Sequence, residues 1–235
     1  MQLQASSRAR IAVLASGGGS NFQAILDFFA ALGAQRAGDI VLVVSDRAGA
    51  PALNRARNAG IEALTIDKGS GDTMLNELVT RGVMIVVLAG YIQLVPTAVV
   101  SAYRGRMVNV HPALLPSFGG KGMYGMRVHA AVLAAGVGVS GPTVHFVDDS
   151  YDRGPIIAQW PVPVSPNDTP ETLGARVLAV EHLLYPRVVQ ALCSGKVRLS
   201  DDNRVLGVPT PESAAAFTMG DYVGLRQSLD RWLGT

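Results

Sequence analysis

An asparagine and a histidine stand two residues apart in the segment Asn109-Val110-His111-Pro112, at the end of an apolar run. Residues two apart on an extended strand project to the same face, so this amide and this imidazole lie side by side. Such a pair can hold the oxyanion that forms when a nucleophile attacks a carbonyl group. The alternative is a polar strand end whose two side chains are satisfied by loop backbone.

A second polar segment, Asp148–Pro155, places Asp152 just before Gly154 and Pro155. This tight connection could aim the Asp152 carboxylate at His111. A carboxylate beside an imidazole favours the protonated ring and fixes its orientation. The competing interpretation is a solvated hairpin loop, which is common for Asp-rich turns.

The third segment is the glycine-rich turn Ser16–Asn21, between an apolar run and a helix-like pattern. Glycines let the backbone approach a ligand, and the free N–H groups of a following helix attract anions. A P-loop would need lysine where Ser20 stands, and a dinucleotide fingerprint would need glycine where Phe22 stands. We therefore expect a monophosphate here, against the alternative of a tight turn without a ligand.

Short β-branched runs alternate with longer segments of helical periodicity, as in parallel βαβ units. The pattern predicts strands at 11–15, 40–45, 63–66, 85–88, 107–110, 143–147 and 156–161, and helices at 21–32, 51–59, 73–81, 97–103, 127–135 and 171–192. The first four helices fall between successive strands. This indicates an α/β fold, an open, mostly parallel twisted sheet with helices on both faces, which binds ligands beyond the carboxyl ends of its strands.

The composition limits the function classes. The chain has 235 residues, of which 49% are apolar and 16% charged, with a formal net charge of +2. A single domain with a sizeable core is expected, and the charge balance gives no support for nucleic-acid binding. No signal peptide and no apolar run long enough for a membrane span is apparent, so we expect a soluble, cytoplasmic protein. One cysteine forms no internal disulfide and has no zinc-site spacing.

A change in composition follows Ser200. We expect residues 1–200 to form the domain and residues 201–235 to form a C-terminal extension, packed on the domain or at an oligomer contact. Its last part, Asp221–Leu233, has the apolar spacing of an amphipathic helix.

Together, these segments resemble the folate-dependent glycinamide ribonucleotide formyltransferases, from about Arg10 to about Leu199. The matching motifs, in the family's order, are SGGGSN (16–21), LAGY (88–91), NVHPALLPSF (109–118), GPTVHFVDDSYDRGPIIAQ (141–159) and VEHLLYP (180–186). The resemblance implies the formyltransferase fold with a Rossmann-like N-terminal half. It also implies a cis Leu115–Pro116 bond.

The resemblance also implies a role for individual residues. Catalysis would fall on Asn109, His111 and Asp152, and ribose binding on Glu181, with His145 as either a supporting residue or a satisfied core histidine. The acceptor phosphate would lie on Gly18, Gly19, Ser20 and Asn21. The folate would be held by Gln93, Leu94, Val95, Val147, Asp148, Asp149, Ser150 and Tyr151. Gln93 departs from the arginine or lysine of many relatives, and the loop at 119–125 is richer in glycine than usual.

The implied reaction transfers the formyl group of 10-formyltetrahydrofolate to the glycine amine of glycinamide ribonucleotide, a step of purine synthesis. It requires no metal, membrane or nucleic acid, and the protein would be a monomer or homodimer. The nearest alternative is a formyltetrahydrofolate deformylase, which usually carries an additional N-terminal domain. A methionyl-tRNA formyltransferase would need a larger, basic C-terminal domain. A silent nucleotide-binding module would not need Asn109, His111 and Asp152 together.

Overall fold

The computed structural model describes residues 8–67, 71–207, 227 and 230. Its strands are β1 (Ala9–Leu14), β2 (Gly38–Ser45), β3 (Glu62–Thr65), β4 (Ile85–Leu88), β5 (Met107–His111), β6 (Val139–Ser140), β7 (Thr143–Phe146), β8 (Ile156–Gln159), β9 (Val162–Pro163), β10 (Arg198–Leu199) and β11 (Val205–Leu206). Its helices are α1 (Ser20–Leu32), the 3₁₀ turn η1 (Gly33–Gln35), α2 (Pro51–Asn58), α3 (Gly71–Thr80), α4 (Thr97–Ala102), α5 (Met126–Ala134) and α6 (Pro170–Cys193).

Each strand and helix predicted up to residue 192 is present, with shifts of a few residues at its ends. The sequence pattern missed β6, β9, β10, β11 and η1, because elements of two or three residues show no periodicity. The helix predicted at Asp221–Leu233 lies outside the described residues.

The main sheet has seven strands in the order β3-β2-β1-β4-β5-β7-β8. The first five are parallel, whereas β7 runs antiparallel to both β5 and β8. The expected open, mostly parallel sheet is therefore confirmed. The chain order reverses between β1 and β4, and ligands bind at such a switch point in open α/β sheets.

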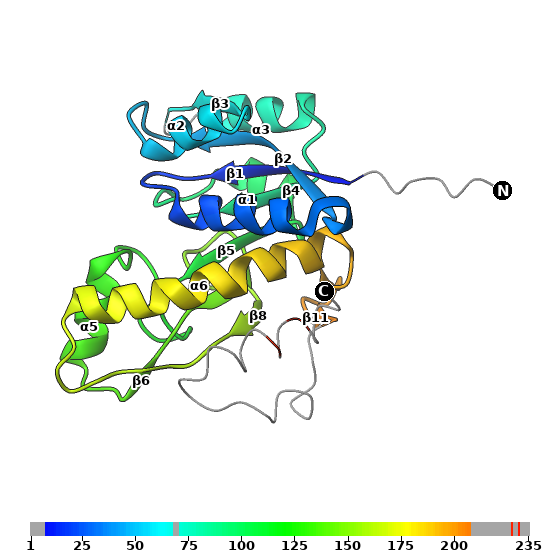
Figure 1. The fold of residues 1–235 in the computed structure, drawn as a ribbon. Helices are drawn as coiled ribbons and strands as arrows, with labels where there is room; N and C mark the ends of the chain where they lie inside the picture. Colours follow the sequence, from blue (N-terminus) through cyan, green and yellow to red (C-terminus); the bar gives the residue numbers. More distant parts are fainter. Residues whose placement is uncertain (1–7, 68–70, 208–226, 228–229, 231–235) are drawn as a thin grey trace.

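The two faces of the sheet are covered by different helices (Figure 1). On β1, Ile11 and Val13 join a core cluster with α1 and α6, whereas Ala12 and Leu14 join a second cluster with α3 and α4. Because both faces are covered, the successive residues from Ile11 to Leu14 are all apolar, and the alternation of a half-exposed strand is absent there.

The loops that follow β1 and β4 are joined by hydrogen bonds at the switch point. The Ser16 N–H donates to the Gly90 carbonyl at 3.1 Å, and the Ile92 N–H donates to Ser16 Oγ at 3.1 Å. The glycine-rich turn therefore lies directly beside the loop that carries residues 93–95.

The described part of the C-terminal extension contacts the domain through the pairing of β11 with β10 and through two side-chain contacts. The Arg104 guanidinium donates to Asn203 Oδ1 at 2.6 Å, and Arg187 forms an ion pair with Asp230 at 3.0 Å. The division of the chain near residue 200 stays a prediction. No helix in the described ranges is long and apolar enough to cross a membrane.

Candidate active site

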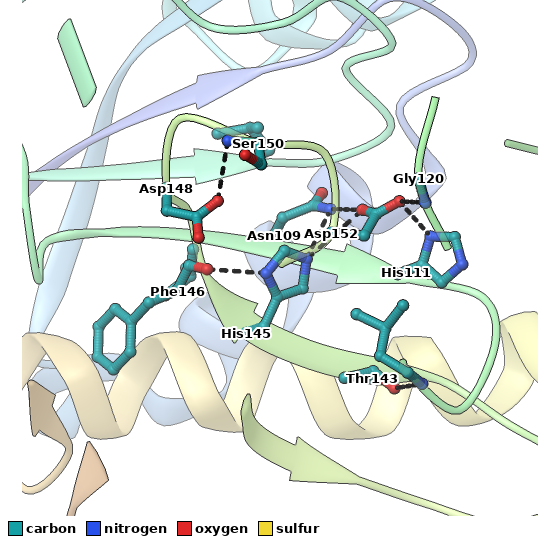
Figure 2. A network of polar contacts seen from close by, with 12 residues as sticks. Asn109, His111, Gly120, Thr143, His145, Phe146, Asp148, Ser150 and Asp152 are labelled. Carbon is teal, nitrogen blue, oxygen red and sulfur yellow. Dashed lines mark hydrogen bonds and ion pairs between the residues drawn. The ribbon is translucent and has the colours of Figure 1, made fainter. Parts of the chain in front are cut away.

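The structure brings Asn109, His111 and Asp152 together (Figure 2). Asn109 and His111 lie on β5, and Asp152 comes from the loop between β7 and β8. Asn109 Nδ2 lies 3.5 Å from one Asp152 oxygen, and His111 Nδ1 lies 3.4 Å from the other. An amide, an imidazole and a carboxylate thus meet at one place, as expected from the sequence.

Backbone geometry directs Asp152 to this place. Since β7 is antiparallel to β5, the chain leaves β7 beside Met107, whose carbonyl accepts a hydrogen bond from the Val147 N–H at 3.0 Å. The loop then returns to Asn109, and Asp152 itself adopts a left-handed conformation with φ of 56°. The Gly120 N–H donates at 2.8 Å to Asp152 Oδ2, the carboxylate oxygen that does not face Asn109, and fixes the carboxylate.

His111 is buried between two oxygen acceptors. Its Nε2 lies 2.9 Å from the Phe118 carbonyl, while its Nδ1 faces Asp152. Burial lowers the pKa of His111 below its ordinary value, and the charge of Asp152 and the Phe118 carbonyl offset this only in part. Asp152 therefore favours the charged ring as expected, but the effect of burial on the His111 pKa is larger.

Asp152 stays ionised in this setting. Burial raises its pKa, but the neighbouring His145 and His111 and the Gly120 N–H together bring the pKa below its ordinary value. The site therefore pairs a charged carboxylate with a buried imidazole that can gain a proton during a reaction.

His145 lies beside Asn109. The register of β5 and β7 sets the two residues opposite each other. His145 Nδ1 lies 2.7 Å from the Phe146 carbonyl and therefore carries a hydrogen, and Nε2 lies 3.1 Å from Asn109 Nδ2 and 3.7 Å from Asp152 Oδ1. His145 is thus buried and bonded and also contacts Asn109, so a supporting role stays a prediction.

The glycine-rich turn lies at the start of α1. Gly19 adopts a left-handed conformation with φ of 72°, and α1 begins at Ser20. The first N–H groups of a helix have no partner within it, so this turn presents donors to an anion. The buried Asn21 side chain is engaged differently, because its Nδ2 donates to Glu181 Oε2 at 2.6 Å. Among the described residues its Oδ1 has no hydrogen-bond partner, and its backbone N–H belongs to the first turn of α1.

Glu181 lies on α6, where the α1 helix covers it. Its side chain is buried, and burial raises its pKa to about 7, although the hydrogen bond from Asn21 acts in the opposite direction. A carboxylate poised near neutral pH becomes a strong acceptor once hydroxyl donors reach it.

Comparison with known proteins assigns the family. Residues 9–189 match the model of the formyl transferase family. The chain belongs to the formyl transferase family. It is 44% identical over 210 residues to the Arabidopsis thaliana protein named phosphoribosylglycinamide formyltransferase, chloroplastic, covering 86% of this chain and 70% of that one.

Solved structures agree with this assignment. Glycinamide ribonucleotide transformylase 1 from Symbiobacterium toebii matches this formyl transferase with a TM-score of 0.77 and 40% identity, covering 86% of this chain and 95% of that one. A formyltetrahydrofolate deformylase from Pseudomonas syringae matches with a TM-score of 0.75 but only 24% identity, covering 86% and 66%. The deformylase likeness is therefore one of fold alone.

In this formyl transferase, the two loops predicted to hold a folate lie close together. Val95, from the loop after β4, is buried in the same core cluster against which Val147 packs. Burial, together with the charges of Asp46 and Tyr151, raises the pKa of Tyr91, in the loop after β4, to about 12. Within these loops, Leu94 is exposed and the Ser150 N–H donates to Asp148 Oδ1 at 3.0 Å.

Sequence reasoning missed two residues that hold the turn after His111. Thr143 Oγ1 donates to the Ala113 carbonyl at 2.7 Å and accepts from the Leu115 N–H at 3.0 Å. Gln159 Nε2 donates to the Leu115 carbonyl at 2.8 Å. The Leu115–Pro116 bond is cis, as expected. Their places within the GPTVHFV and PIIAQ motifs were the available signal, but only strand register shows what they contact.

Proposed function

We propose that this formyl transferase moves the formyl group of 10-formyltetrahydrofolate to the glycine amine of glycinamide ribonucleotide, a step of purine synthesis. The observation that carries the proposal is the convergence of Asn109, His111 and Asp152 in the domain whose first strand leads into the glycine-rich turn. The names of the Arabidopsis thaliana and Symbiobacterium toebii relatives support the choice of acceptor.

In the proposed reaction the amine attacks the formyl carbon and forms a tetrahedral oxyanion. Asn109 Nδ2 would donate to that oxygen, where the charge develops, and the positive charge of a protonated His111 would stabilise it. His111 gains positive charge readily in this step because Asp152 lies 3.4 Å from its Nδ1. The bond from carbon to the folate nitrogen then breaks. The amine loses one proton and the folate nitrogen gains one, so the proton balance closes within the site.

We further propose how the substrates lie. Gly18, Gly19 and the backbone N–H groups of Ser20 and Asn21 would hold the acceptor phosphate, and Glu181 would accept hydrogen bonds from the ribose hydroxyls. The folate would lie along residues 93–95 and 147–151. Among the described residues, no group of three metal-ligating side chains could hold a metal ion.

A cytoplasmic location and a monomeric or homodimeric state stay predictions. The Arabidopsis thaliana relative is named as chloroplastic, so relatives of this chain are not confined to one compartment. Sedimentation of the purified protein over a range of concentrations would settle the oligomeric state.

The test is release of tetrahydrofolate from 10-formyltetrahydrofolate with and without glycinamide ribonucleotide. We expect release that depends on the acceptor and yields formylated nucleotide in equal amount. Equal release in the absence of acceptor would establish the deformylase activity instead. Asn109→Ala serves as the matched inactive control, because it removes one donor to the oxyanion.

A further inference from the structure

Helix α2 packs directly behind the glycine-rich turn. The Ala52 N–H donates to the Gly17 carbonyl at 3.1 Å, and Arg55 Nε donates to the Gly18 carbonyl at 2.8 Å. A methyl group added at Gly19 would lie only 2.8 Å from Ala52 Cβ. Two consecutive carbonyl groups of the turn therefore accept hydrogen bonds from α2. The sequence pattern did not connect this helix with the site.

This bonding matters for the direction of the peptide groups. A carbonyl oxygen that faced the predicted phosphate would repel it, whereas an N–H group attracts it. The bonds from Ala52 and Arg55 hold the Gly17 and Gly18 oxygens toward α2. The N–H groups that begin α1 are then left to the anion.

The charge of Arg55 is not neutralised by a direct ion pair. Among the residues that the structure describes, no carboxylate lies within 4.0 Å of its guanidinium. Its Nη1 donates to Gln23 Oε1 at 3.3 Å, and Gln23 Nε2 in turn donates to Asp27 at 2.8 Å. The nearest acid along these bonds is thus separated from Arg55 by a neutral amide.

Arg55 also shares a surface with the first residue of α1. Ser20, Gln23, Arg55 and His182 line one pocket of about 500 Å³, which continues between α1 and α6. The exposed guanidinium therefore adds positive charge beside the start of α1, where the helix dipole also favours an anion.

We propose that Arg55 is a positioning residue for the nucleotide phosphate, which holds the Gly18 peptide in its binding orientation and adds an uncompensated positive charge. This inference rests on the proposed function, since it takes the glycine-rich turn as the phosphate site. It assigns to α2 a part in acceptor affinity and none in the formyl transfer.

The test measures binding by calorimetry, with glycinamide ribonucleotide and with inorganic phosphate as titrants. Arg55→Met should weaken binding of both about tenfold, the scale of one lost hydrogen bond from a charged donor. Arg55→Lys should recover part of the affinity, because it keeps the charge without the Nε–H donor. Arg57→Met is the matched control, because Arg57 lies on the same helix, is exposed and bonds to Asn54 Oδ1 at 3.0 Å.

Steady-state kinetics provide the second readout. For Arg55→Met, the KM for glycinamide ribonucleotide should rise about tenfold, while kcat and the KM for the folate change less than about twofold. Equal affinity of Arg55→Met and Arg57→Met for both titrants would overturn the inference, as would an equal rise of both KM values. If the parent protein released no tetrahydrofolate in response to acceptor, the proposed function would fail, and the phosphate titrations would still decide the role of Arg55.

Discussion

Glu181→Gln is expected to make the folded protein more stable at alkaline pH and to leave its stability unchanged at acidic pH. Glu181 is buried between α6 and α1, and its pKa is raised to about 7 from an ordinary value of 4.5. Glutamine keeps the acceptor for Asn21 and the shape of the side chain, but it has no charge to bury.

The sign follows from proton linkage. Between pH 4.5 and about 7 the folded state keeps the Glu181 proton that the unfolded state has released, so stability falls as pH rises through this range. Above about pH 7 both states are ionised and the loss is complete. At ~1.4 kcal/mol per pH unit, the interval corresponds to about 3 kcal/mol. The free energy of unfolding of Glu181→Gln should therefore exceed that of the parent by about this amount at pH 8.

The assay is urea unfolding of the parent and Glu181→Gln at several pH values from 4 to 8. Glu77→Gln controls for the loss of one carboxylate, because the Glu77 side chain is 35% exposed. Stability curves for the parent and Glu181→Gln that run parallel over this range would refute the reasoning. Calorimetry of nucleotide binding gives a second test. Because the charged carboxylate is the stronger acceptor for the ribose hydroxyls, the affinity of the parent for the nucleotide should rise through about pH 7. The affinity of Glu181→Gln should not change in this way.

Three further predictions concern the site and the loop that carries Asp152. Asn109→Ala should lower kcat by about 100- to 1,000-fold with little change in either KM, since its bond to the oxyanion forms in the transition state; turnover near that of the parent would exclude this role. The double change of His111→Ala and Asp152→Ala should cost much less than the product of the single losses, because the carboxylate acts through the imidazole; multiplicative losses in kcat would separate them. Gly154→Ala should destabilise the fold by at least about 2 kcal/mol, because a methyl group there would clash with the backbone carbonyl of Phe146. Gly138→Ala, with no atom within 4 Å of the added methyl group, is its control in thermal unfolding.

Much of the fold and the site could be predicted from local sequence. The apolar runs at 11–15 and 85–88 identify buried parallel strands, because strands covered on both faces need continuous apolar side chains. The spacing of Asn109 and His111 predicts a shared face, and the three glycines before Ser20 predict a turn open to an anion. These signals are local, so they can be read without knowing which segments meet.

Only the tertiary structure decided the contacts between segments far apart in the chain. The antiparallel register of β5 and β7 sets His145 opposite Asn109, and the packing of α1 on α6 buries Glu181 against Asn21. The burial of His111, which lowers its pKa, likewise depends on groups from several elements. Strand register, burial and charge environment are properties of the packed chain, because each depends on residues brought together from distant positions.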